Sequence, residues 1–118
     1  MSFDFADVVL VPFPFTNQAE SKKRPAIVVS SRAYNSVKPD VVVMAVTSQL
    51  RPSPEFGETW INAWQAAGLL KPSAVKPVFA TLEQDFVIRQ LGRLAERDHI
   101  LLASAIRKIL GEAGADQP

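Results

Sequence analysis

Two groups of polar side chains are the residues of this sequence best suited to chemistry. One is a basic cluster directly before a proline, and the other is a short row of hydroxyl and amide side chains: Lys22, Lys23 and Arg24; Thr47, Ser48 and Gln49. An arginine guanidinium presents a fixed fork of donors to phosphate oxygens and stabilises negative charge that develops on them. A hydroxyl and an amide can orient the same group. Together these side chains predict a phosphodiester site. The alternative is structural: a solvated loop end and the polar end of a strand.

Other candidates for chemistry are more readily explained by structure. The carboxylate pairs resemble acid–base pairs but are typical of solvated loops and strand ends. The lone histidine falls in the first turn of a predicted helix, away from its apolar face, and the tryptophans suit core packing better than base stacking. These residues are Glu55 and Glu58, Glu83 and Asp85, His99, Trp60 and Trp64.

Composition restricts the kinds of enzyme this chain can be. Its 118 residues include no cysteine, which excludes disulfides, a thiolate nucleophile and a cysteine-ligated zinc site. A single histidine excludes an HExxH pair and a histidine-cluster metal site. An enzyme with this composition is expected to work without histidine, metal or cofactor.

The net charge of +1 conceals an uneven distribution. Residues 1–20 hold three acids and no base, whereas residues 21–59 hold six bases against three acids. A basic central region favours an anionic partner. The acidic N-terminus differs from a secretory signal, and the apolar runs are far shorter than the roughly 20 residues that span a bilayer. We therefore expect a cytoplasmic protein with no membrane partner.

The hydropathy pattern predicts a mainly β fold with a terminal helix. Strands are expected over Asp7–Val11, Pro25–Ser30, Val41–Ser48, Thr59–Ile61, Val75–Leu82 and Phe86–Leu94. A loop is expected at Thr16–Lys23, a turn at Arg32–Pro39, and a brief helix at Ala63–Ala67 between an Asn62 cap and Gly68.

Apolar residues at three- and four-residue steps predict the terminal helix over Glu96–Leu110, and Gly111 suits its C-cap. The expected architecture is a small β-barrel with this helix packed against it, as a single domain over residues 1–111. Residues 112–118 are expected to be a frayed tail.

The predicted second and third strands bring the two polar groups together. A connection of about nine residues favours an antiparallel hairpin. If Ser31 faces Val41, paired positions have a constant sum, and Arg24 lies beside Thr47 or Ser48. One rim of the sheet would then carry the arginine, both hydroxyls and Gln49, with Lys22 and Lys23 just outside.

Several segments, in order, resemble the MazF/PemK family of toxins from type II toxin–antitoxin systems. The similarity covers about residues 6–110 and is carried by Ala6–Val11, Lys22–Ser30, Tyr34–Asn35, Ala45–Gln49, Gly68–Ser73, Ala80–Leu82 and Leu91–Leu94. It implies an SH3-like barrel of the PemK and CcdB type, a homodimer, and sequence-specific cleavage of single-stranded RNA without metal. It also implies a cognate antitoxin peptide as partner.

The resemblance assigns catalysis to Arg24 and Thr47. The 2′-hydroxyl of the ribose would attack the adjacent phosphate and leave a 2′,3′-cyclic phosphate and a 5′-hydroxyl end. Lys22, Lys23, Ser48 and Gln49 would contact the RNA. The group that takes the 2′-hydroxyl proton is left open, as is the RNA sequence cut.

This chain departs from the family pattern at three places. Ala6-Asp7 replaces a frequent Gly-Asp pair, and Glu20 lies only near the position of a frequent loop glutamate. Pro77-Val78 replaces an acidic or amide pair, a change that bears on base recognition. Two other functions remain open: a CcdB-like gyrase poison that binds without cleaving, and a non-catalytic SH3-like binding module.

Overall fold

The computed structural model describes residues 2–13 and 22–111. Its strands are β1 (Asp7–Phe13), β2 (Lys22–Val28), β3 (Asp40–Thr47), β4 (Thr59–Ile61), β5 (Ser73–Glu83) and β6 (Arg89–Arg93). Its helices are α1 (Arg32–Val37) and α2 (Glu96–Leu110), and a 3-10 turn spans Gln84–Phe86. The predicted frayed tail, Glu20 and most of the predicted loop over Thr16–Lys23 lie outside the described residues.

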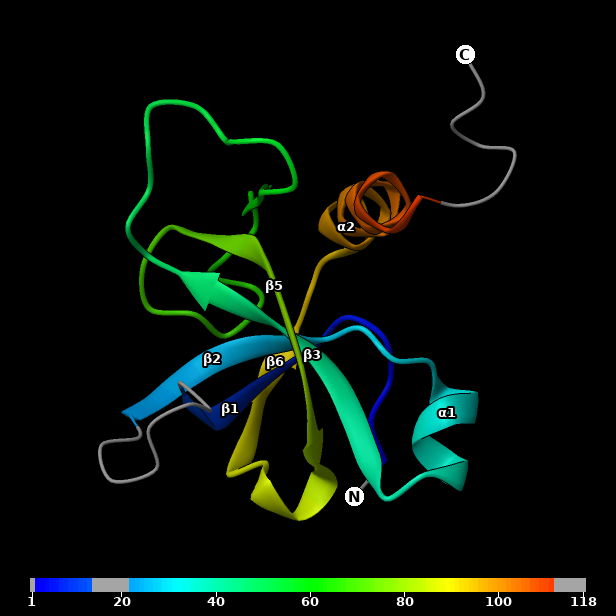
Figure 1. Cartoon of the computed structure of the whole chain (residues 1–118). Helices are drawn as coiled ribbons and strands as arrows, with labels where there is room; N and C mark the ends of the chain where they lie inside the picture. The colour runs from blue at the N-terminus through cyan, green and yellow to red at the C-terminus, as the bar shows by residue number, and fades with distance from the viewer. Residues whose placement is uncertain (1, 14–21, 112–118) are drawn as a thin grey trace.

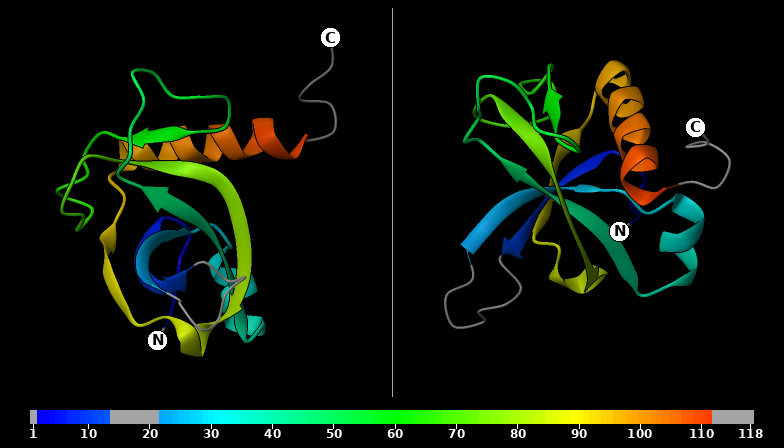
Figure 2. Two further views of the ribbon diagram at one scale, coloured as in Figure 1. Left: turned by 60° about the vertical axis from the view of Figure 1, so that its left-hand side comes forward. Right: turned by 45° about the horizontal axis from the view of Figure 1, so that its top comes forward.

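The strands form one antiparallel sheet in the order β4-β5-β3-β2-β1-β6. The sheet curls into a half-barrel, with the long strand β5 bending from beneath α2 to the opposite end of the molecule (Figures 1 and 2). Where β5 bends, three of its residues, Lys76–Val78, lie in a register shift opposite β3. The predicted mainly β fold with a C-terminal helix is confirmed.

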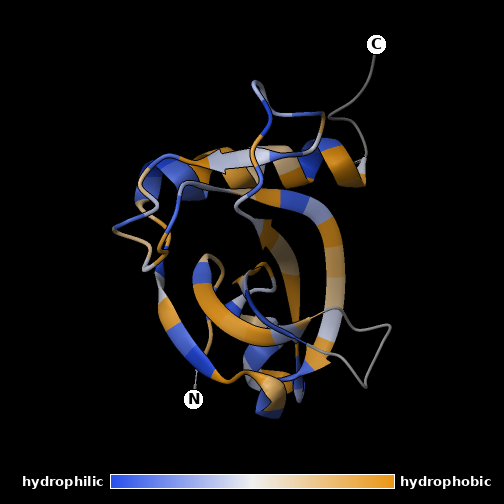
Figure 3. Ribbon diagram, turned by 90° about the vertical axis from the view of Figure 1, so that its left-hand side faces the viewer, coloured by the Kyte–Doolittle hydropathy of each residue, from blue (hydrophilic) through white to orange (hydrophobic). Residues whose placement is uncertain are grey.

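Buried side chains lie on both faces of the sheet. Alternate residues of β1, β2 and β3 belong to two separate apolar clusters. Val8, Ile27 and Met44 pack with Leu102 of α2, whereas Val9, Ala26 and Val43 pack with Phe3 inside the curl. Burial on both faces explains why these strands read as continuous apolar runs without polar alternation. The hydropathy colours follow this pattern along the strands in Figure 3.

Helix α2 has the bounds that its sequence pattern predicts. Leu102 is fully buried, and Ile106 and Ile109 pack against the same cluster. Gly111 ends the helix in the left-handed conformation, at φ 67°. Among the described residues, no helix has the length and apolar character needed to cross a membrane.

Several local predictions are wrong. Lys22 and Lys23 belong to β2 and not to the predicted loop over Thr16–Lys23. The predicted turn over Arg32–Pro39 contains α1, because the Ser31 side chain accepts a hydrogen bond from the Tyr34 amide and caps the helix. The predicted helix at Ala63–Ala67 is a series of hydrogen-bonded turns. The last strand begins at Arg89 rather than Phe86, since the 3-10 turn occupies the residues before it.

Hydrogen bonds close the end of the sheet beside α1. The buried Asn35 amide donates to the carbonyls of Phe3 and Ser30, and its oxygen accepts from the Ser30 hydroxyl at 2.5 Å. The Gln84 amide donates to the carbonyls of Asn35, Lys38 and Asp40. We call this region the α1 end.

Two ion pairs tie the N-terminal segment, residues 2–7, to the rest of the protein. Arg32 makes two hydrogen bonds of 2.6 Å to the Asp4 carboxylate, and Arg93 makes one of 2.7 Å to Asp7. The Arg32 hydrogen bond lowers the pKa of Asp4 below its usual value, and the same contact raises the pKa of Arg32. Between these residues Ala6 is buried at a positive φ of 81°, a conformation that glycine adopts more readily.

Candidate functional site

The register of β2 on β3 places Arg24 and Thr47 on one face of the sheet. Ala26 pairs with Ala45 and Val28 with Val43, so paired positions sum to 71 and the predicted sum of 72 is one residue off. The pairing ends at Ala26 and Ala45, and Arg24 and Thr47 lie two residues beyond it on their strands, where they line the same pocket. Both residues share a face with Ala26 and Ala45, whose short side chains leave room beside them.

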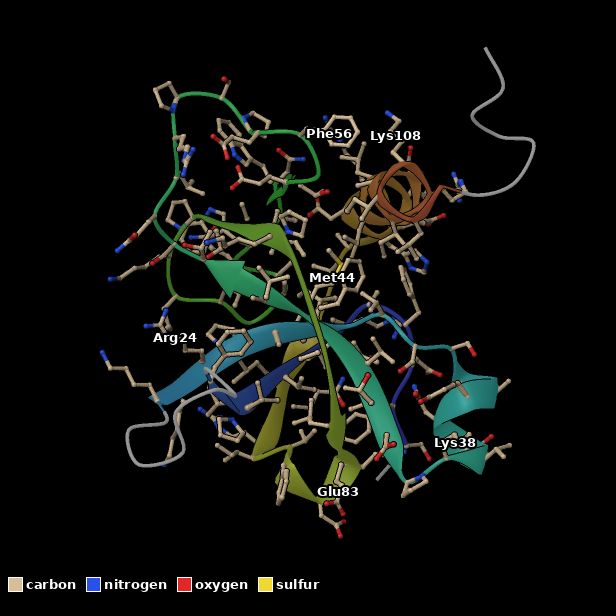
Figure 4. The ribbon with its side chains drawn as sticks, viewed as in Figure 1. Arg24, Lys38, Met44, Phe56, Glu83 and Lys108 are labelled. Carbon is tan, nitrogen blue, oxygen red and sulfur yellow. The ribbon has the colours of Figure 1, made fainter. Side chains whose placement is uncertain are left out.

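A pocket of about 590 Å³ opens at this end of the hairpin. All six predicted site residues line it: Lys22, Lys23, Arg24, Thr47, Ser48 and Gln49. The Arg24 side chain extends from β2 at the left of the molecule, on the side away from α1 (Figure 4). Thr47 is half-buried, and the other five are exposed. The structure therefore gathers every predicted site residue around one cavity.

Among the described residues, all the ionisable side chains that line this pocket are basic. Lys22, Lys23 and Arg24 are joined there by Lys76 from the bend of β5. Within residues 2–13 and 22–111, none of these four residues forms an ion pair. Their charges are thus available to an anion. The Thr47 hydroxyl accepts the Gln49 backbone amide at 3.1 Å, a local turn that fixes the direction of its side chain.

Sequence reasoning did not identify every residue at this pocket. Lys76 was missed because its position depends on the register shift between β3 and β5, which pairs residues about thirty positions apart. The walls also include Phe13, Ser73 and Val78. Val78 belongs to the Pro77-Val78 pair, where the chain departs from the family pattern, so this departure reaches the pocket itself.

The remaining sequence candidates lie elsewhere. The His99 ring packs against Phe5 with ring centroids 4.8 Å apart, and Trp64 packs against the core. Glu55 pairs with Arg51, and the Glu58 carboxylate accepts the Glu55 amide. None of these side chains lines the basic pocket. In the described residues, no cluster of three histidine or acidic side chains has the arrangement of a metal site.

Residues 4–110 match the family described as the PemK-like, MazF-like toxin of type II toxin–antitoxin systems. The chain belongs to this family. Comparison of this PemK/MazF-like toxin with curated proteins found no match.

Solved structures of MazF toxins share the fold of this PemK/MazF-like toxin. The MazE–MazF complex from Deinococcus radiodurans is 22% identical with a TM-score of 0.74, covering 96% of this chain and 99% of the other. The Mycobacterium tuberculosis toxin MazF-mt6 is 21% identical with a TM-score of 0.72, covering 89% and 96%. A mycobacterial endoribonuclease bound to its cognate antitoxin is 18% identical with a TM-score of 0.71, covering 93% and 94%.

Proposed function

We propose that this toxin is an endoribonuclease that cleaves single-stranded RNA at specific sequences without a metal ion. The observation that carries the proposal is the basic pocket, where an arginine, a threonine and flanking lysines surround one cavity. Among the described residues, no acid lines this pocket and the arginine has no ion-pair partner. Similar structures described as endoribonucleases support the same activity. Cleavage of messenger RNA would account for growth inhibition by a toxin of this family.

Arg24 is the main catalytic group in this proposal. The 2′-hydroxyl of the ribose loses its proton as its oxygen bonds to the adjacent phosphorus. The bond from phosphorus to the 5′-oxygen breaks, that oxygen takes up a proton, and the products are a 2′,3′-cyclic phosphate and a 5′-hydroxyl. Negative charge grows on the phosphate oxygens during this step. A guanidinium stays protonated near neutral pH, so Arg24 acts by stabilising that charge and donating hydrogen bonds, not as the base.

Thr47 orients the phosphate in front of Arg24. Its hydroxyl hydrogen is free to point into the pocket because the hydroxyl oxygen already accepts the Gln49 amide. Lys22, Lys23, Ser48 and Gln49 line the same cavity and contact the RNA backbone or bases on either side. Lys76 joins Lys22, Lys23 and Arg24 as a fourth basic residue that binds phosphate.

The expected partners follow from the same surface. Among the proteins of similar fold, a MazF is found with MazE and a mycobacterial endoribonuclease is found with its cognate antitoxin. We propose that this toxin forms a homodimer and is silenced by an antitoxin peptide. An acidic, partly apolar peptide that folds on binding would neutralise the basic pocket and exclude RNA.

The decisive experiment incubates the purified toxin with defined single-stranded RNA in EDTA and maps the ends. The expected products carry a 2′,3′-cyclic phosphate and a 5′-hydroxyl. The Arg24→Ala variant should remain folded while cleavage falls by about 10²- to 10³-fold. Arg97→Ala is the matched control, because Arg97 is an exposed arginine that lies outside the basic pocket.

Each other outcome has a definite meaning. Full cleavage by Arg24→Ala would remove Arg24 from the site. Cleavage that requires added Mg²⁺ would overturn the metal-free mechanism. No cleavage at all, together with trapping of gyrase on DNA, would replace the nuclease proposal with a CcdB-like poison.

A further inference from the structure

A second pocket, of about 570 Å³, adjoins the basic pocket. The two share four lining residues: Lys23, Pro25, Ser48 and Ser73. Beyond these, the second pocket is bounded by Leu10, Leu70, Lys71, Arg89 and Leu91. We call it the flanking pocket. Its continuity with the basic pocket means that one extended ligand can occupy both.

The flanking pocket lies on the opposite face of the sheet from Arg24. Leu10 of β1 pairs with Pro25 of β2 and with Arg89 of β6, so these three residues form a row across three strands. Because side chains alternate along a strand, this row shares a face with Ile27, whereas Arg24 shares the other face with Ala26. A ligand that fills both pockets must therefore pass over the end of the hairpin.

The far wall of the flanking pocket is held firmly in place. Gly68 has a φ of +86°, and a Cβ built there would lie only 2.1 Å from the Leu91 carbonyl oxygen. The turn before Leu70 thus packs backbone to backbone against β6. At its start, the buried Asp98 carboxylate accepts the backbone amides of Asn62 and Ala63. Leu70 and Lys71 are consequently positioned beside Arg89 without help from a ligand.

The chemistry of this wall suits a nucleotide. The ionisable residues that line the pocket are Lys23, Lys71 and Arg89, and none forms an ion pair within the described parts of the chain. Leu70 is 93% exposed beside these charges. Cations on a pocket rim bind phosphate, and an exposed leucine offers an apolar surface to a base or ribose.

We propose that the flanking pocket binds a nucleotide of the RNA outside the cleaved step, with its phosphate at Lys71 and Arg89 and its base against Leu70. This inference rests on the proposed nuclease function and extends the binding surface to the second face of the sheet. It also gives a physical reason for a single-stranded substrate. A flexible strand can turn over the end of the hairpin, whereas a double helix is too stiff to do so; that of DNA has a persistence length of about 150 base pairs.

The test uses three RNAs made after the cleavage site has been mapped. One is the shortest oligonucleotide that the toxin cleaves, and the others extend it by several nucleotides on the 5′ or the 3′ side. Cleavage of each is measured for the toxin and for Lys71→Ala, Arg89→Ala and Leu70→Ala. Lys38→Ala serves as control, because Lys38 is exposed beside α1, across the molecule from Arg24 (Figure 4).

The expected result is selective for RNA length. Lys71→Ala and Arg89→Ala should each raise KM by roughly three- to tenfold for one extended RNA and leave cleavage of the shortest RNA unchanged. Binding to a 2′-deoxy analogue of that extended RNA should also depend less on salt. The slope of log K against log salt concentration should fall in magnitude by about 0.7 for each basic side chain removed. Leu70→Ala should raise KM without changing this slope.

Two results would overturn the inference while the nuclease proposal stands. One is equal cleavage of all three RNAs by the variants and the toxin, which would show that the RNA does not occupy the flanking pocket. The other is an equal loss on the shortest and extended RNAs, which would indicate a general structural effect. Failure of the unmodified toxin to cleave any RNA would instead remove the proposed function itself.

Discussion

The β2–β3 hairpin has two polar ends that differ in one respect, which is whether their polar groups find partners inside the protein. At the α1 end, the amides of Asn35 and Gln84 are fully engaged with backbone carbonyls and with Ser30. At the other end, the lysines and the arginine that line the basic pocket have no ion-pair partner in the described residues. We call this second region the basic end.

This difference separates residues that stabilise the fold from residues whose charges stay available for the proposed ligand. A buried polar group without a partner costs free energy, so the α1 end must satisfy its groups internally. Exposed cations lose little when they stay unpaired in water. The basic end can therefore keep its charges free for an anion, and substitutions at the two ends should affect different properties.

The largest expected effect is on catalysis at the basic end. Thr47→Val removes the hydroxyl while keeping the branched shape, and RNA cleavage should fall by about 10²-fold because the phosphate loses a positioning hydrogen bond. Thr47→Ser should restore most of the activity. The thermal unfolding midpoint should change little, because the Gln49 backbone amide, which donates a hydrogen bond to the Thr47 hydroxyl, can donate to water instead. An inactive Thr47→Ser variant, or a large loss of stability in Thr47→Val, would contradict this division.

The next effect is on stability at the α1 end. Asn35→Ala leaves the Ser30 hydroxyl and two backbone carbonyls without their partner, and the free energy of unfolding should fall by about 2–3 kcal/mol. Cleavage per folded molecule should stay unchanged. Denaturant unfolding and RNA cleavage measure the two quantities.

Ser36→Ala is the control for Asn35→Ala on the same helix. The Ser36 hydroxyl is exposed and donates only to the Ala33 carbonyl. Its removal should leave stability nearly unchanged. A loss of cleavage by folded Asn35→Ala would show that the α1 end contributes to the site, and the contrast between the two ends would fail.

The sequence predicts best where structure depends on local interactions. The bounds of α2 follow from an apolar face and a glycine cap within the same fifteen-residue segment and the residue after it. That the six predicted site residues line one pocket could be predicted, because only the antiparallel order of the two strands and an approximate register are needed to bring these residues together. The exact register of β2 on β3 cannot be predicted in this way. Val29 and Ser30 both donate to the Val42 carbonyl, and this irregularity at the strand end is not visible in the sequence.

The features that sequence reasoning misses depend on distant partners. Asn62 is predicted to cap a helix with its own side chain, yet its amide groups bind Asp98, which is 36 residues away. Lys76 reaches the basic pocket only because β5 bends opposite β3. The backbone contact of Gly68 with Leu91, which builds the flanking pocket, is likewise a tertiary contact. Local propensity carries no information on such contacts.

The smallest expected effect compares two exposed arginines across pH. Arg32 pairs with Asp4 and lowers the pKa of that carboxyl, so the pair stabilises the folded protein above the ordinary Asp pKa of 3.8 and loses this effect as pH falls through the folded-state value. Arg32→Ala should therefore lower the thermal midpoint slightly at pH 7, and this difference should shrink as pH falls below 3.8 and vanish below the folded-state pKa of Asp4. High salt should reduce the difference, since Arg32 is mostly exposed. Arg24→Ala should show no such pH dependence, because Arg24 has no carboxylate partner in residues 2–13 and 22–111. A difference for Arg32→Ala that persists unchanged at low pH would mean that its packing, and not its charge, ties down the N-terminal segment.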